Sequence, residues 1–122
     1  MKKILIAEDE PQLLKLLLDR FTKEGLVAVG APDGAVALEM AFKEHPDLIL
    51  LDILMPVMDG VTALRRLRQD AWGKTAFVMV LTNLRDSARV AECLSLGVPD
   101  YLVKSDCRLE EIVKRVKEKL GN

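Results

Sequence analysis

Short apolar runs alternate with helix-patterned stretches along this chain of 122 residues, and this rhythm limits the fold more than any other property. Several runs are continuously apolar rather than alternating, which is typical of parallel strands covered on both faces. The runs that we interpret as strands are Ile4–Ala7, Leu26–Val29, Leu48–Ile53, Phe77–Leu81 and Tyr101–Val103. The length is that of one ordinary domain, so we expect residues 1–122 to form a single domain.

Apolar residues at helical spacing fill the stretches between these runs. The first stripe is Leu14, Leu17, Leu18 and Phe21, between Pro11 and Gly25. Asp33 is placed to cap a second helix, which must end near His45 because Pro46 cannot continue it. Two shorter stripes are Val61, Leu64 and Leu67, then Ala91 and Leu94 before Gly97. The last is Leu109, Ile112, Val113, Val116 and Leu120, for which we expect Ser105 or Asp106 as the cap.

Five strands alternating with five helices predict an α/β domain with a parallel sheet, because each crossover must be right-handed and cover one face. At this size the best candidate is the doubly wound, flavodoxin-like (βα)5 fold with strand order 2-1-3-4-5. In that order strands 1 and 3 are neighbours, and ligands bind at the carboxyl ends of the strands there. The residues at those ends therefore carry the functional prediction.

Composition excludes several classes of protein. The 18 basic and 19 acidic residues give a net charge of −1, so we expect neither direct nucleic-acid binding nor adhesion to an anionic membrane. No apolar run approaches the roughly 18 residues of a membrane span, and the first residues lack the features of a secretory signal. Cys93 and Cys107 form no CxxC motif, which favours reduced thiols and a cytoplasmic protein.

Polar residues stand at the predicted carboxyl ends of four strands. Glu8 and Asp9 follow the first run, Asp52 falls at the end of the third, Thr82 follows the fourth and Lys104 the fifth. If the strand order is right, three carboxylates meet one ammonium and one hydroxyl. Crowded carboxylates repel one another unless a cation relieves them, and Mg²⁺ prefers such oxygen ligands.

A phosphoryl group at this edge would meet the metal, Lys104 and the Thr82 hydroxyl, which are the groups that phosphoryl transfer requires. The nucleophile must be a carboxylate, because no Ser or Cys stands at a strand end with a base nearby. Asp52 is best placed, at the end of the most apolar strand. Singly, each residue also fits an ordinary role as a helix cap, a turn acid or an edge charge; their joint position favours the functional interpretation.

Over essentially its whole length the chain resembles a response-regulator receiver domain, similar to the chemotaxis receivers. Such domains are the phospho-accepting half of two-component signalling. The motifs that carry the resemblance are Glu8-Asp9, Asp52 followed by Met55-Pro56 and Asp59-Gly60, Thr82, and Asp100-Tyr101-Leu102-Val103-Lys104. Their order and spacing are specific to the family.

The resemblance implies a metal site and a phosphorylation site. Asp52 would be the phosphorylated aspartate. Asp9 and Asp52, with the backbone carbonyl of Leu54, would bind Mg²⁺, and Glu8 would act through a metal-bound water.

The resemblance also implies a switch. Lys104 would pair with the phosphoryl oxygens, and the backbone amide of Asn83 would donate to them. The Thr82 hydroxyl would move towards the phosphoryl group on activation, which would let the Tyr101 ring swing inward; without the resemblance, Tyr101 could equally be a core residue.

The implied partner is a histidine kinase or a histidine phosphotransfer protein. The face of the fourth helix, fifth strand and fifth helix would then engage a downstream target or a second copy of the chain. The chain would be a phosphorylated switch and not a turnover enzyme. Leu13 and Leu16 lie outside the main stripe of the first helix, so they are either additional core residues or a docking surface for the kinase.

Three positions depart from the family pattern. Ser105 replaces the usual proline after Lys104, so we expect a trans peptide and some displacement of that loop. Asn83 replaces a small residue, and its side chain is expected to narrow phosphoryl access. Leu54 and Leu84 replace polar groups that handle water, which predicts slow self-dephosphorylation.

Two other functions compete with this one. A flavodoxin-like binding protein would need a loop of backbone amides for phosphate, whereas the loop here is Glu8-Asp9-Glu10-Pro11. A Mg²⁺-dependent phosphatase would need a general acid near Asp52, where Ile53 and Leu54 follow instead. His45 and Trp72 are interpreted as a helix-terminal surface residue and a loop anchor.

Overall fold

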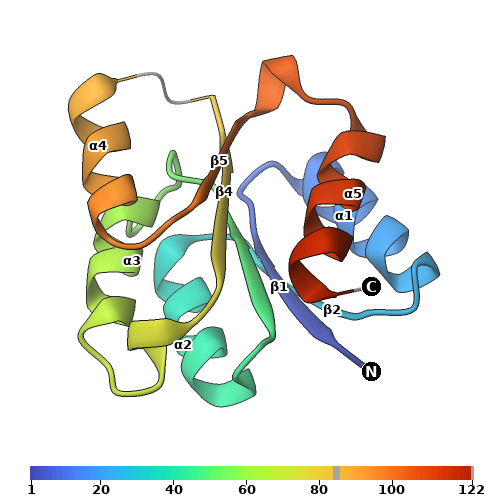
Figure 1. Ribbon diagram of the computed structural model, residues 1–122, viewed down its shortest axis with the longest axis horizontal. Helices are drawn as coiled ribbons and strands as arrows, with labels where there is room; N and C mark the ends of the chain where they lie inside the picture. Colours follow the sequence, from blue (N-terminus) through green and yellow to red (C-terminus); the bar gives the residue numbers. More distant parts are fainter. Residues whose placement is uncertain (84–85, 122) are drawn as a thin grey trace.

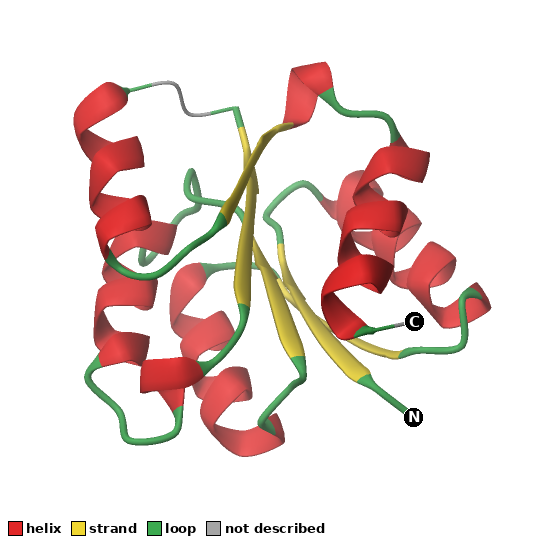
Figure 2. Cartoon of the chain, viewed as in Figure 1, coloured by secondary structure: helices red, strands yellow, loops and turns green. Residues whose placement is uncertain are grey.

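A single parallel sheet lies between two layers of helices in the computed structural model, which describes residues 1–83 and 86–121 (Figure 1; Figure 2). The strand order is β2-β1-β3-β4-β5, so the predicted order is confirmed. The strands are β1 (Lys3–Ala7), β2 (Val27–Ala31), β3 (Leu48–Leu51), β4 (Val78–Thr82) and β5 (Asp100–Val103). All neighbouring strands pair in parallel.

The helices divide between the two faces of the sheet, with α1 and α5 on one side and α2, α3 and α4 on the other (Figure 1). They are α1 (Pro11–Lys23), α2 (Gly34–Glu44), α3 (Gly60–Arg68), α4 (Ser87–Ser95) and α5 (Leu109–Leu120), with short 3-10 turns η1 (Gly73–Thr75) and η2 (Lys104–Asp106). Among the described residues, no helix is both long and apolar enough to cross a membrane.

Local sequence explains where these helices begin. Pro11 occupies the first turn of α1, where its missing N–H costs no helical hydrogen bond. Asp33 caps α2 by accepting the Val36 amide at 2.9 Å, as the sequence predicts. Asp59 caps α3 in the same way, accepting the Thr62 amide at 3.0 Å. Each cap satisfies an amide that has no partner inside the helix.

Successive side chains of each strand point to opposite faces of the sheet and pack into two separate apolar cores. On β1, Ile4 and Ile6 face α1 and α5, where they pack with Phe21. Leu5 and Ala7 face the opposite layer. This burial on both faces explains why the strands are continuously apolar in the sequence.

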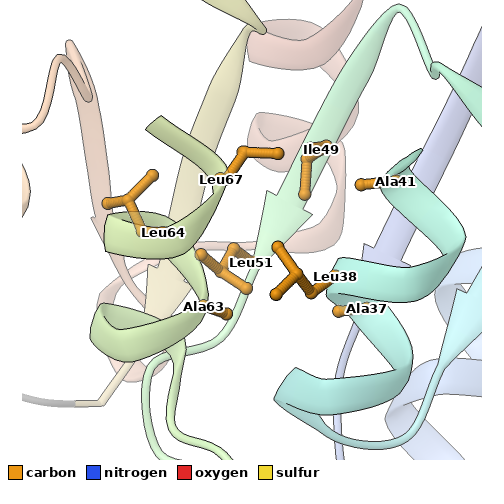
Figure 3. Close-up of a pocket in the computed structure, with 8 residues that line it drawn as sticks. All are labelled: Ala37, Leu38, Ala41, Ile49, Leu51, Ala63, Leu64 and Leu67. Carbon is orange, nitrogen blue, oxygen red and sulfur yellow. The ribbon is translucent and has the colours of Figure 1, made fainter. Parts of the chain in front are cut away.

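Small residues leave a pocket between α2, α3 and β3 (Figure 3). Ala37, Ala41 and Ala63 border it, while Ile49 and Leu51 of β3 line its floor. Its volume of about 20 Å³ is roughly that of one water molecule, and its lining is apolar. It therefore offers no room for a flavin or a nucleotide, which needs a pocket of roughly 300 Å³ or more.

Several sequence-based details are wrong. The third strand ends at Leu51 rather than at residue 53, β4 runs from residue 78 to 82 rather than from 77 to 81, and β5 begins at Asp100 rather than at Tyr101. β2 runs from residue 27 to 31 rather than from 26 to 29, because Gly30 and Ala31 pair with the end of β1. The expected caps of α5, Ser105 and Asp106, lie in η2 instead, and α5 begins after Arg108 without a side-chain cap.

The His45 ring stacks on Trp72, with ring centroids 4.3 Å apart and planes inclined by 8°. His45 ends α2 in a left-handed conformation, and Trp72 belongs to the loop after α3. The stack confirms Trp72 as a loop anchor. It joins the ends of two neighbouring helices.

Candidate functional site

Parallel pairing of β1 with β3 brings the first acidic residues together. Ala7 is in register with Leu51, so the residues that follow each strand meet at the same edge of the sheet. The Asp52 amide donates to the Ala7 carbonyl at 3.0 Å, which extends this pairing by one residue. Asp52 therefore lies beside Glu8.

The carboxylates of Glu8, Asp9 and Asp52 each place one oxygen within 4.8 Å of the others. Glu8 is 2% exposed and Asp52 is 3% exposed, whereas Asp9 faces solvent. Two buried acids and one exposed acid thus form a cluster with an open side. Repulsion between like charges at such distances is strong where water is excluded.

Lys104 supplies a positive charge to this cluster from the end of β5. Its ammonium lies 2.8 Å from a carboxylate oxygen of Asp52 and 2.8 Å from one of Glu8. A third oxygen, on exposed Glu10, lies 3.5 Å away. Burial alone would lower the pKa of Lys104, but the hydrogen bonds to Asp52 and Glu8 outweigh it and raise the pKa.

Burial has the opposite effect on Glu8. Loss of solvation raises the pKa of its carboxyl group, and the hydrogen bond from Lys104 only partly opposes this rise. The nearby Asp52 carboxylate raises it further. The ionised form of Glu8 is therefore less stable than that of a solvent-exposed glutamate, and a cation bound beside it would stabilise the ionised form.

Backbone groups orient the two buried carboxylates. The Leu54 amide donates to Asp52 Oδ1 at 3.2 Å, and the Glu10 amide donates to Glu8 Oε2 at 3.0 Å. Gly60 packs so closely that a Cβ there would lie 2.4 Å from the Asp52 carbonyl oxygen. Position 60 therefore requires glycine if Asp52 is to keep its place.

Thr82 and Tyr101 lie on the two strands beyond Asp52. Thr82 is the last residue of β4 and is fully buried. Tyr101 pairs with Val80 in the β4–β5 ladder and packs, partly buried, against the core under α2, α3 and α4. Burial raises the pKa of its hydroxyl. Four strand ends thus place the predicted side chains along one edge of the sheet.

The donor set fits a hard divalent cation. Three carboxylates converge from two strands, one of them is open to solvent, and one ammonium cannot neutralise all three. Mg²⁺ takes oxygen ligands and commonly keeps several waters beside one or two carboxylates. The open side at Asp9 leaves room for such waters.

The departures from the family pattern have visible consequences. The Lys104–Ser105 peptide is trans, as predicted, and the Lys104 side chain still reaches Asp52. Asn83 is exposed, and its side-chain oxygen accepts the Ser105 amide at 3.0 Å. Leu54 is 46% exposed beside Asp52. Leu84 lies outside the described residues.

Sequence reasoning missed two contacts around the site. The Asn83–Ser105 hydrogen bond joins the loop after β4 to the turn after β5, and no pattern within either segment signals it. Arg89 of α4 lies 3.6 Å from Asp59, the cap of α3. Both contacts join segments far apart in the chain, so only the tertiary structure reveals them.

Comparison with known protein families gives a match over residues 4–117 to the family described as the response regulator receiver domain. A probable transcriptional regulator, ycf27 of Galdieria sulphuraria, is 35% identical over 121 residues, covering 94% of this chain and 46% of the regulator. The regulatory protein PhoP of Bacillus subtilis is 34% identical over 121 residues, covering 93% of this chain and 49% of PhoP. The chain thus spans about half the length of these relatives.

Solved structures agree with these sequence matches. The chemotaxis response regulator CheY4 of Vibrio cholerae superposes with a TM-score of 0.87 at 26% identity, covering 98% of each chain. The similarity therefore extends over the whole sheet and its helices.

Proposed function

Because the chain belongs to the response regulator receiver domain family of two-component signalling, we propose that Asp52 accepts a phosphoryl group from the phosphohistidine of a histidine kinase or a histidine phosphotransfer protein. The contact of the Lys104 ammonium with the Asp52 carboxylate, at 2.8 Å, carries this proposal. The ammonium supplies a positive charge beside the carboxylate that would accept the phosphoryl group. Such preorganised charge is the main source of catalysis in phosphoryl transfer.

The proposed step exchanges one bond to phosphorus for another. An electron pair on an Asp52 carboxylate oxygen forms the new O–P bond, while the P–N bond to the donor imidazole breaks. The electron pair of that bond stays with the imidazole, which keeps or takes up one proton and leaves as neutral histidine. Lys104 gives up part of its contact with the carboxylate and pairs with the phosphoryl oxygens.

Glu8, Asp9, Asp52 and the backbone carbonyl of Leu54 are the groups that would hold Mg²⁺, with Glu8 acting through a water. The bound cation would offset negative charge on the carboxylates and on the phosphoryl oxygens. Before the donor arrives, the Leu54 amide and the Lys104 ammonium hold the Asp52 carboxylate in place. The buried side of the cluster excludes competing water.

The output face consists of α4, β5 and α5. We propose that the Thr82 hydroxyl moves towards the phosphoryl group and that the Tyr101 ring then turns inward. Asp100, at the start of β5, lies 3.1 Å from Lys119 and 3.6 Å from Arg115 of α5, so this face is rich in charge. A downstream protein or a second copy of the chain would bind there.

The donor protein would dock beside α1. Leu16 on α1 is 50% exposed, whereas Leu13 packs partly against the core. Of the two interpretations of these leucines, the docking surface therefore applies to Leu16. Leu13 and Leu16 line one groove together with Lys104, and a contiguous apolar surface of this kind marks an interaction site.

Hydrolysis of the phosphorylated form would be slow. Leu54 stands half-exposed next to Asp52 and has no group that could orient an attacking water. Replacing it by glutamine (Leu54→Gln) should shorten the phosphoryl lifetime. A wild-type lifetime among the shortest of receiver domains would contradict this part of the proposal.

Acetyl phosphate and Mg²⁺ test the proposed function, with the intact mass of the protein as the readout. We expect one phosphoryl group per chain, dependence on Mg²⁺, and no incorporation in Asp52→Asn. Asp47→Asn is the control, because Asp47 lies at the opposite end of the sheet and bonds the Lys3 amide. Release of many phosphates per chain would instead indicate the phosphatase, and no incorporation would refute the proposal.

A further inference from the structure

Two residues that depart separately from the family pattern contact each other. Asn83 directly follows Thr82, the last residue of β4, and Ser105 directly follows Lys104. The Asn83 side-chain oxygen accepts the Ser105 amide at 3.0 Å across 22 residues of sequence. β4 and β5 are neighbours, with Thr82 in register with Val103, so this bond lies just beyond their last paired residues.

The Asn83–Ser105 hydrogen bond forms because the turn that begins at Lys104 leaves an amide without a partner inside the turn. Residues 104–106 form the 3-10 turn η2, and the first amides of any such turn have no carbonyl partner within it. The residue before the turn, Val103, provides no side-chain cap. Asn83 provides one from the neighbouring loop. A proline at position 105 would have no N–H to satisfy, whereas serine does.

We propose that Asn83 is a positioning residue that caps the turn after β5 and thereby holds Lys104 against Asp52. Its side chain joins the loop that follows Thr82 to the turn that contains Lys104, so the backbone of Lys104 keeps its place beside the end of β4. This role rests on the proposed phosphorylation of Asp52. It opposes the sequence-based expectation that the Asn83 side chain mainly obstructs the phosphoryl group.

The rate of phosphorylation separates these two roles. In Asn83→Ala the Ser105 amide loses its cap, so we expect phosphorylation by saturating acetyl phosphate to slow by about two- to fivefold, the effect of losing one exposed hydrogen bond. A side chain that obstructs would give a faster variant. An unchanged or increased rate would overturn the positioning role.

Affinity for Mg²⁺ shows whether the loss is specific. The carboxylates of Glu8, Asp9 and Asp52 stay in place, and a looser Lys104 competes less with the cation. Asn83→Ala should therefore bind Mg²⁺ at least as tightly as the wild type while it reacts more slowly. Weaker binding together with slower reaction would indicate general disruption of the site and would contradict the proposal.

Hydrogen exchange of the Ser105 amide provides a readout that needs no phosphorylation. Exchange should be faster in Asn83→Ala than in the wild type, and it should stay slow in Asn83→Asp, which keeps the accepting oxygen. Ser95→Ala is the control, because it removes an exposed hydrogen bond to the Glu92 carbonyl at the far end of α4. Equal exchange in all variants would refute the cap, whereas failure of the wild type to be phosphorylated would refute only the proposed function.

Discussion

The Lys104 ammonium lies 2.8 Å from the carboxylate of Asp52, a residue 52 positions earlier in the chain. The sheet order creates this contact, because β4 separates β3 from β5 and the long lysine side chain spans that distance. The ammonium also reaches Glu8 at 2.8 Å. One flexible cation thus balances two buried acids until a metal or a phosphoryl group competes for them.

Removal of the Lys104 ammonium should make the free energy of unfolding depend more strongly on Mg²⁺. In Lys104→Met, Glu8 and Asp52 keep their burial but lose their shared partner, so the free energy of unfolding should fall by about 1–3 kcal/mol without divalent cations. Added Mg²⁺ should recover most of the loss. Urea denaturation with and without Mg²⁺ measures both effects, and Lys15→Met, on the exposed side of α1, is the control. Equal Mg²⁺ stabilisation of all three proteins would contradict this role of Lys104.

The loop after β3 contains a strained backbone position at Val57. Its φ angle is +68°, in the left-handed region that β-branched residues rarely adopt, and its side chain is 83% exposed. Val57→Gly should raise the free energy of unfolding by about 0.5–1 kcal/mol, because relief of strain exceeds the entropic cost of glycine. Val57→Ala keeps a Cβ and should give little gain. Thermal unfolding distinguishes them, and equal stability of the two variants would argue against strain.

Arg68 joins three segments at the other end of the sheet. Its guanidinium donates to four backbone carbonyls, those of Gly73, Ala76, Leu96 and Gly97, at 2.7–3.2 Å. A lysine cannot reproduce this planar set of donors. Arg68→Lys should therefore lower the free energy of unfolding by about 1–3 kcal/mol, while exposed Arg66→Lys should change it little. Phosphorylation of Asp52 should persist in both; its loss in Arg68→Lys alone would link this region to the site.

An ion pair between α1 and α5 should make stability depend on pH. Hydrogen bonds from Lys117 and Arg20 lower the pKa of Glu24 below its ordinary 4.5. A lowered pKa stabilises the fold above pH 4.5, and this stabilisation is lost as the pH falls through the lowered value.

Glu24→Gln should consequently destabilise the protein at pH 7, and the difference from the wild type should shrink below pH 4. Urea denaturation at the two pH values measures the change. Exposed Glu118→Gln should show no such trend. If the difference in free energy of unfolding between the wild type and Glu24→Gln grew as the pH fell, the Glu24 carboxylate would not be the stabilising form.

Much of the fold could be predicted from the sequence, because the spacing of apolar residues shows which face of each strand or helix is buried. The runs that begin at Leu48 and Phe77 predicted buried parallel strands, and their order came from size and crossover rules. The ends of elements were harder to predict. Gly30 and Ala31 have low strand propensity but complete β2, because β1 lies beside them.

Some features of the site could likewise be predicted from the sequence, and others could not. Glu8, Asp52 and Lys104 could be predicted to meet, because each stands at the predicted carboxyl end of a strand and the order of those strands was predicted as well. The Asn83 cap depends on side-chain directions between distant segments, which no local pattern encodes. The same holds for the contacts of Arg68 with backbone carbonyls at the other end of the sheet. The Val57 conformation also escaped prediction, because valine normally indicates extended backbone.

The most direct test of the account is to locate the phosphoryl group within the chain. Borohydride reduction converts an acyl phosphate at aspartate into homoserine, and tandem mass spectrometry of the digested protein then identifies the residue. After treatment with acetyl phosphate and Mg²⁺, we expect homoserine at position 52 and none at positions 9 or 59. Modification at another aspartate, with position 52 unchanged, would contradict the account.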